Sequence, residues 1–283
     1  MPGPAFAQAT TDRVSGVAPG GRPATRRLSA SAFRIRAVAL RLALLLARVL
    51  PHPKRTPFTF YYLLVLLATT ITANLLSTHE RLALLHAAST NAANLLQRPL
   101  GVLVSSALWL ADGHWQVYLL LFTVLIAPLE RRIGPRWTLA VFASGHVLAT
   151  LLTELPVLYA IREHLAPARF GHWLDFGVSY GMFAVAGALV LALRWRQRRW
   201  AILALYVLVA LASLGSGPVA WMTAAGHVAA VHIGMLGWLP WARRRGLLGT
   251  LELHPIGVLL RELRIAGTRL PTPVERLPST MGQ

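Results

Sequence analysis

Six apolar segments occupy the middle of this 283-residue chain and constrain its fold more than any other feature. Most of them approach the about 20 residues that an α-helix needs to cross about 30 Å of hydrocarbon, although the fifth is short. Backbone amides inside lipid must be paired within their own segment, so each segment is expected to be helical. We therefore predict an all-α, polytopic membrane protein with six transmembrane helices. The approximate ranges of the segments are 58–77, 112–129, 137–161, 176–193, 200–214 and 218–239.

Composition supports this class. Hydrophobic residues make up 55% of the chain and charged residues only 13%, which is too apolar for a water-soluble domain of this size. The formal net charge of +18 comes mainly from arginine, since Lys54 is the only lysine. Such a charge could attract nucleic acid or anionic lipid, and its placement around the apolar segments favours lipid headgroups as partners over nucleic acid. The chain has no cysteine, which excludes disulfides, thiolate chemistry and cysteine-based metal sites.

Two basic tails flank the apolar region, which we assign as a membrane domain over residues 58–240. Residues 1–57 are rich in Pro, Gly, Ala and Arg, and the first thirty lack hydrophobic periodicity, which predicts disorder there. Arginines at seven-residue spacing then interrupt an Ala/Leu run at about 31–50, which predicts an amphipathic helix lying on the membrane surface. The second tail comprises residues 241–283.

The arginines also orient the expected helices. Clusters precede the first segment, separate the second from the third and the fourth from the fifth, and follow the sixth, so with six crossings they all fall on one side. The positive-inside rule then places both termini in the cytoplasm, and we expect the plasma (inner) membrane. Under this assignment Ser179, at the start of the fourth segment, lies near the outer face. The clusters contain Arg48, Lys54 and Arg55; Arg131, Arg132 and Arg136; Arg194, Arg196, Arg198 and Arg199; and Arg243, Arg244 and Arg245.

Three polar residues fall at a similar depth in this arrangement. His114 opens the second segment, Ser179 opens the fourth, and His227 lies about two turns below the outer end of the sixth. A serine, a histidine able to take its proton and a second histidine at the same level could form a nucleophile, a base and an oxyanion donor. The structural alternative is that the serine caps a helix and that the histidines bridge neighbouring helices. Spacing alone leaves both interpretations open.

At these residues the chain resembles the rhomboid intramembrane serine proteases. Their fourth span begins GxSG and continues with an aromatic residue four positions after the serine and then a glycine. Their sixth span carries HxxGxxxG, and their second span has a histidine, an asparagine four residues later, and an acidic residue before a closing glycine. The matching residues here are Gly177, Ser179, Phe183 and Gly187; His227, Ala230 and Gly234; and His114, Tyr118, Glu130 and Gly134.

The resemblance implies a serine-type intramembrane endopeptidase that cuts transmembrane protein substrates with a Ser-His dyad, without a carboxylate, cofactor or metal. Ser179 would be the nucleophile and His227 the general base. His114 would donate to the oxyanion beside the Ser179 amide, and Phe183 would pack on the His227 ring. The small residues of the sixth span, Ala230 and Gly234 among them, would let two helices approach closely.

Ala230 enlarges one glycine of the sixth-span pattern, and two further departures lie beside the expected catalytic residues. Tyr118 stands where the family has asparagine, so its hydroxyl is the oxyanion donor candidate at that position. Tyr180 follows the serine where the family has glycine, and adds bulk beside the nucleophile. Glu130, inside the LERRIG run, is expected to tie the inner end of the second segment to a neighbouring helix.

Two other classes of function remain as alternatives. A rhomboid-like protein that binds transmembrane clients without cutting them would keep every architectural feature and need no dyad. A transporter would need buried charges along a path or an internal repeat. The apolar segments contain only Glu154 as such a charge near membrane depth, and no clear repeat.

Overall fold

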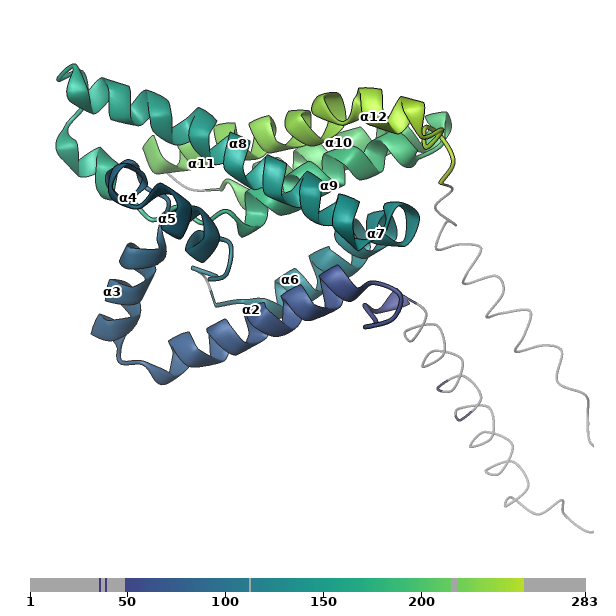
Figure 1. Ribbon diagram of the computed structural model, residues 1–283, viewed down its shortest axis with the longest axis horizontal. Coiled ribbons are helices and arrows are strands. Elements are labelled where there is room, and N and C mark those ends of the chain that lie inside the picture. Colours follow the sequence, from purple (N-terminus) through teal and green to yellow (C-terminus); the bar gives the residue numbers. More distant parts are fainter. Residues whose placement is uncertain (1–35, 37–38, 40–48, 112, 215–217, 252–283) are drawn as a thin grey trace, which may run out of the picture. The chain divides into compact units, whose positions relative to one another are not determined.

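The computed structural model describes residue 36, residue 39 and the ranges 49–111, 113–214 and 218–251. These three ranges lie within one compact unit, Leu46–Leu259. In these residues the regular structure is helical, apart from one isolated bridge between Leu193 and Leu251 (Figure 1). The all-α prediction is thereby confirmed. The predicted disorder of the first thirty residues lies outside the described residues, and so does most of the predicted amphipathic helix at 31–50.

Each of the six apolar segments contains helix. Three helical stretches, Pro57–Leu75, Pro135–Arg162 and Ala220–Arg244, are long and apolar enough to cross a membrane, and Val178–Ala192 is a shorter apolar helix. The count of six spans therefore stays a prediction. In chain order the segments form α2 (Pro57–Leu75); α6 (Trp115–Leu121), η1 (Phe122–Ile126) and α7 (Ala127–Ile133); α8 (Pro135–Arg162); α9 (Val178–Ala192); α10 (Trp195–Ala212); and α11 (Pro218–His232), η3 (Ile233–Gly237) and α12 (Leu239–Arg244).

Short helices in the connections between these segments were not predicted. The long first connection contains α3 (Thr78–Ala88), α4 (Ala92–Gln97) and α5 (Pro99–Ser106), and η2 (Ala168–His172) follows α8. Local capping interactions explain where two of these helices, α3 and α4, begin. Ser77 and Glu80 form a reciprocal capping box at the start of α3, and the Asn91 side chain accepts from the Asn94 amide at the start of α4.

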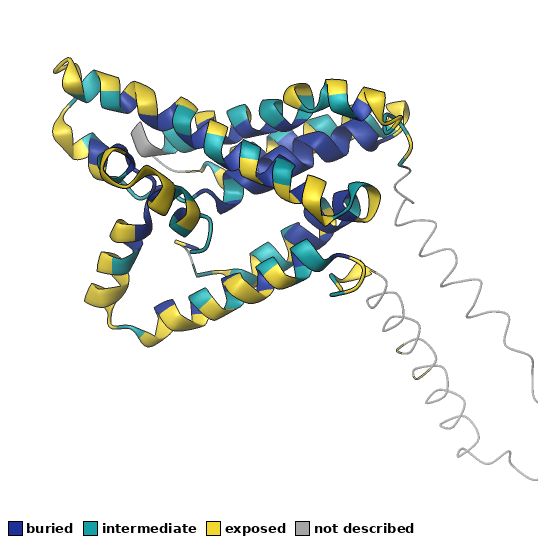
Figure 2. Ribbon diagram, in the orientation of Figure 1, coloured by how far each residue is buried: buried dark blue, intermediate teal, exposed yellow. Residues whose placement is uncertain are grey.

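Helix α9 forms the centre of the fold. Every residue from Val178 to Ala192 is buried except Ser179, which is half-buried (Figure 2). A helix that is apolar on all sides needs neighbours on all sides, and α9 packs against α8, α10, α11, η1 and η3. Helix α9 is therefore held by several elements at once.

Small residues bring α9 and the last helical stretch into backbone contact. A Cβ atom added to Gly187 would collide with the Val231 carbonyl, and one added to Gly234 would collide with the Ala184 carbonyl. Ala230, on the same helix as Val231, is fully buried. This is the close approach that small residues permit between helices.

Glu130 joins α7 to the start of α2. Its carboxylate accepts from the amides of Phe58, at 2.7 Å, and Thr59, at 2.9 Å, and also from the Thr59 hydroxyl. These amides belong to the first turn of α2, where no intrahelical acceptor exists and negative charge is favourable. Since Glu130 is 2% exposed, its hydrogen bonds replace lost hydration.

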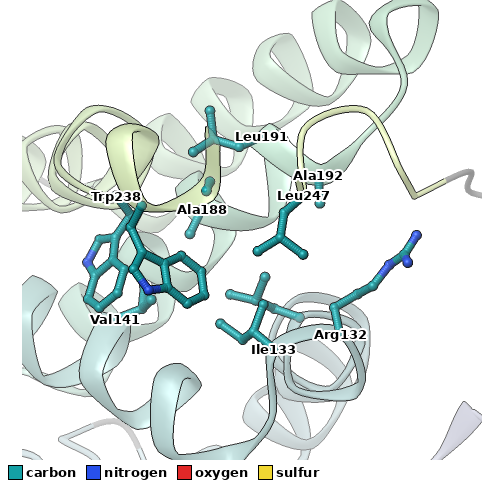
Figure 3. A pocket seen from close by; sticks show the side chains of 11 residues that line it. Arg132, Ile133, Val141, Ala188, Leu191, Ala192, Trp238 and Leu247 are labelled. Atoms are coloured by element: carbon teal, nitrogen blue, oxygen red, sulfur yellow. The ribbon is translucent and has the colours of Figure 1, made fainter. Parts of the chain in front are cut away.

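A small cavity lies beside the last turn of α9. It has a volume of about 20 Å³ and is lined mainly by apolar side chains, including Leu191, Trp238 and Leu247 (Figure 3). That volume is about the space of one water molecule, and the lining offers few polar partners, so the cavity is a packing gap rather than a ligand site.

Large apolar side chains cover the outward faces of the longer helices. Tyr61 and Ile71 of α2, Leu203 and Val207 of α10, and Trp221 of α11 are all exposed. Apolar surface on so many helices is typical of a protein surrounded by lipid.

Candidate active site

Ser179 and His227 lie within hydrogen-bonding distance. The Ser179 Oγ atom is 2.9 Å from Nε2 of His227, although the residues are 48 positions apart. Ser179 occupies the first turn of α9, and His227 lies in α11 on the side that packs against it. The backbone contact at Gly187 and Gly234 holds these two helices together, so the serine and the histidine meet.

Two aromatic rings fix the plane of the His227 imidazole. The Phe183 ring packs against it at a tilt of 48°, with centroids 4.5 Å apart, and Tyr180 approaches edge-on with centroids 5.5 Å apart. Phe183 stands one helical turn after Ser179, so both side chains face α11. His227 is 2% exposed, and this burial limits the orientations open to its ring.

The second ring nitrogen of His227 also has a partner. Its Nδ1 atom lies 3.0 Å from the hydroxyl of Ser213, which caps the C-terminus of α10. Within the described residues, the hydrogen-bond partners of His227 are thus two serine hydroxyls and no carboxylate. Ser213 was not predicted as a site residue, because the SLGSGP sequence in which it stands contains no recognised motif.

The dyad opens onto a cavity of about 370 Å³. Its wall combines the loop before α6, one face of α6, the start of α9, the end of α10 and α11. Much of this lining is apolar, as a site for an apolar peptide segment requires. The lining residues are Trp109, Ala111, Val117, Tyr118, Leu121, Leu174, Asp175, Phe176, Val178, Ser179, Tyr180, Met182, Phe183, Ala212, Thr223 and His227.

The start of α9 supplies backbone donors next to the nucleophile. Gly177 is the N-cap and has no side chain to offer, and the first amide that donates back to the Gly177 carbonyl is that of Gly181. The Ser179 amide therefore belongs to the first turn, whose N–H groups lack acceptors within the helix. Such an amide, at the positive end of a helix dipole, suits a developing oxyanion.

The two side-chain oxyanion candidates differ in position. Tyr118 is half-buried in α6 and lines the cavity that contains Ser179. His114 is the exposed N-cap residue of α6, and the described residues that line the cavity do not include it. The oxyanion roles of both residues remain predictions.

Tyr180 is anchored by Asp175. Its hydroxyl donates to Oδ1 of Asp175 at 2.9 Å, and the Thr90 hydroxyl donates to Oδ2 at 3.0 Å. Burial raises the pKa of the Asp175 carboxyl above its ordinary value, while these two hydrogen bonds act in the opposite direction. The network links the first connection, through Thr90, to the start of α9. Asp175 was not predicted as a site residue, although it is one of only 10 acidic residues and stands two positions before the Gly177 motif.

The remaining residues of the predicted motif lie in the packing around the dyad. Gly177 is buried against His146 of α8, where any Cβ would collide with the imidazole ring. Gly187, Ala230 and Gly234 lie at the contact of α9 with the last helical stretch, as described above. Among the residues that the structure describes, no three His, Asp or Glu side chains group as metal ligands would.

The fold and the serine–histidine pair agree with one class of membrane protein. Over residues 52–247 the sequence matches the family described as "Rhomboid-like protein", and the chain belongs to that family. The match covers every helix from α2 to α12. No curated protein and no solved structure matches the chain.

Proposed function

We propose that this chain is a serine-type intramembrane endopeptidase that cleaves transmembrane protein substrates with Ser179 and His227. The observation that carries the proposal is the 2.9 Å separation of Ser179 Oγ from His227 Nε2 at the wall of a partly apolar cavity. A structural hydrogen bond between two helices would not require this opening.

The proposed reaction uses Ser179 Oγ as the nucleophile and His227 Nε2 as the base. Ser179 Oγ attacks the scissile carbonyl carbon while Nε2 of His227 takes the hydroxyl proton. The resulting oxyanion accepts from the Ser179 amide, with Tyr118 and His114 as candidate side-chain donors. His227 then gives its proton to the leaving amine as the C–N bond breaks, which leaves an acyl ester on Ser179. Water then attacks the ester carbonyl carbon while His227 takes one of its protons, and His227 returns that proton to Ser179 Oγ as the C–O bond to the serine breaks and the acid product leaves.

We infer that six spans cross the membrane, with both termini in the cytoplasm. The segments assigned to the cytoplasmic side contact one another: Arg131 donates to the Val49 carbonyl, Arg132 to the Thr250 carbonyl, and the Arg194 amide to the Leu251 carbonyl. Such contacts are expected if all these segments emerge on one side.

The segments assigned to the outer side also contact one another. The Ser89 hydroxyl and the Asn91 amide group, both in the first connection, donate to the Trp173 carbonyl in the connection before α9.

On the side assigned to the cytoplasm, Arg245 lies over the rings of Trp137 and Trp241, 5.7 Å from each ring centroid. Tryptophan and arginine gathered at helix ends are typical of a membrane interface, where anionic headgroups would be the partners of the basic tails.

Cleavage of a fluorescent model transmembrane substrate by the full chain in detergent micelles tests the enzymatic proposal. Ser179→Ala and His227→Ala should each abolish cleavage, while His232→Ala should retain it. His232 is the matched control because it lies on α11 but contacts Tyr206 rather than Ser179. If the wild type binds transmembrane peptides but cuts none of them, the chain is instead a rhomboid-like binder of transmembrane clients.

A further inference from the structure

Both nitrogens of the His227 ring are engaged by serine hydroxyls that come from different helices. Ser179 of α9 lies at Nε2, and Ser213, at the end of α10, lies 3.0 Å from Nδ1. The ring therefore spans α9 and α10 from its place on α11. A histidine that serves as a base for Ser179 needs a free lone pair on Nε2, so its proton must be on Nδ1.

A proton on Nδ1 requires an acceptor, because the His227 side chain is 2% exposed. A buried N–H without a partner loses its hydration and gains nothing in return. The described residues provide one hydrogen-bond partner for this nitrogen, the Ser213 hydroxyl. The need for an acceptor at Nδ1 grows when His227 takes the Ser179 proton, since the ring is then positively charged and both of its nitrogens carry hydrogen.

We propose that Ser213 is a positioning residue that holds Nδ1 of His227, so that Nε2 faces Ser179 and the Nδ1 proton keeps an acceptor during proton transfer. Its part in the reaction rests on the proposed peptidase function, whereas its effect on the histidine does not. A serine hydroxyl is neutral, so it can orient the ring without bringing the negative charge of an aspartate into a site that adjoins lipid.

The same two helices contain a matched control. The Tyr206 hydroxyl of α10 lies 3.2 Å from Nε2 of His232 on α11, so Tyr206→Phe removes a hydroxyl from the other histidine and leaves His227 untouched. Ser213→Thr keeps a hydroxyl at the site and should behave as the wild type. Ser213→Ala removes it at little change in side-chain size.

Nitrogen NMR of the full chain with ¹⁵N-labelled histidine, in detergent micelles, shows directly which ring nitrogen of His227 carries the proton. The His227 signals are assigned by their loss in His227→Gln. In the wild type, Ser213→Thr and Tyr206→Phe, the proton of His227 should reside on Nδ1. In Ser213→Ala the ratio of the Nδ1–H form to the Nε2–H form should fall by about 3- to 10-fold, as expected for one neutral hydrogen bond. An unchanged ratio in Ser213→Ala would overturn the proposal.

Substrate cleavage by the same variants provides the second readout. Ser213→Ala should lower kcat by about 3- to 10-fold with KM unchanged, and Ser213→Thr should restore it. Failure of the peptidase function and failure of the positioning role give different results. If the wild type is inactive but its ratio of Nδ1–H to Nε2–H forms still falls in Ser213→Ala, only the peptidase function is contradicted. If the wild type is active but this ratio is the same in Ser213→Ala, only the positioning role is contradicted.

Discussion

The Tyr180 ring fills the space into which a side chain at Gly226 would project. A Cβ atom added to Gly226 would lie 2.6 Å from two carbons of that ring. The Tyr180 ring is held in this position, because its hydroxyl donates a hydrogen bond to the buried Asp175 carboxyl group. The bulk that Tyr180 adds beside the nucleophile is thus accommodated in α11, by the glycine one position before His227.

Gly226→Ala is expected to destabilise the fold by about 1–3 kcal/mol, the usual cost of overpacking. Unfolding in mixed micelles measures the change. In a Tyr180→Ala background the same substitution should cost almost nothing, since the colliding ring is gone. Gly237→Ala is the control, because a Cβ there meets nothing within 4 Å. Equal costs in both backgrounds would show that the two positions are not coupled.

Replacing Glu130 should loosen the junction of α7 with α2. Glu130→Gln keeps the size of the side chain but loses the charge and one acceptor oxygen, so one donor among the Phe58 amide, the Thr59 amide and the Thr59 hydroxyl is left unpaired. We expect the free energy of unfolding to fall by about 1.5–3 kcal/mol.

The exposed Glu163, at the C-terminal end of α8, provides the control for Glu130. Glu163→Gln should change stability by less than about 0.5 kcal/mol, as surface substitutions usually do. If Glu130→Gln is equally silent, the hydrogen bonds of Glu130 do not stabilise the junction.

Removing the Tyr118 hydroxyl tests whether this side chain donates to the oxyanion. If its hydroxyl donates in the transition state, Tyr118→Phe should lower kcat by about 10²–10³ with little change in KM or stability. If Tyr118 only lines the cavity, Tyr118→Phe should be nearly silent, and Tyr118→Asn, which restores the family residue, should raise kcat. Steady-state cleavage of the model substrate by the two variants separates these outcomes.

The proposed orientation can be tested with single cysteines, because the native chain contains none. Leu165 is 75% exposed between α8 and η2, and Arg196 is exposed at the start of α10. In intact cells an impermeant maleimide should label Leu165→Cys and spare Arg196→Cys until the membrane is permeabilised. The reverse pattern would invert the topology.

The sequence predicted the helices that have strong hydrophobic runs, and the resemblance to the rhomboid family predicted that Ser179 and His227 form a pair. Runs of apolar residues are local, so they identify helices such as α2 and α8 directly. The connecting helices lack such runs. A signal for α3 was nevertheless present, since Ser77 followed three residues later by Glu80 is the pattern of a capping box.

The side chains around the dyad were harder to predict, because their contacts depend on how separate elements pack in three dimensions. Ser213 at the end of α10 contacts His227 of α11, and Asp175 contacts Thr90, which is 85 positions away in the sequence. Neither contact follows from periodicity or from a local motif, since the first depends on how α10 packs against α11 and the second on how the first connection meets the start of α9. The fit of Tyr180 against Gly226 likewise requires the relative position of two helices.

Reaction with a fluorophosphonate probe in detergent micelles tests the central claim most directly, because it needs no knowledge of the substrate. The probe forms a phosphonate ester only with a serine whose hydroxyl is activated by a base. The wild type should be labelled at Ser179, labelling should be lost in Ser179→Ala and in His227→Ala, and it should persist in His232→Ala. A folded wild type that is not labelled, or labelling that survives in Ser179→Ala, would contradict the account.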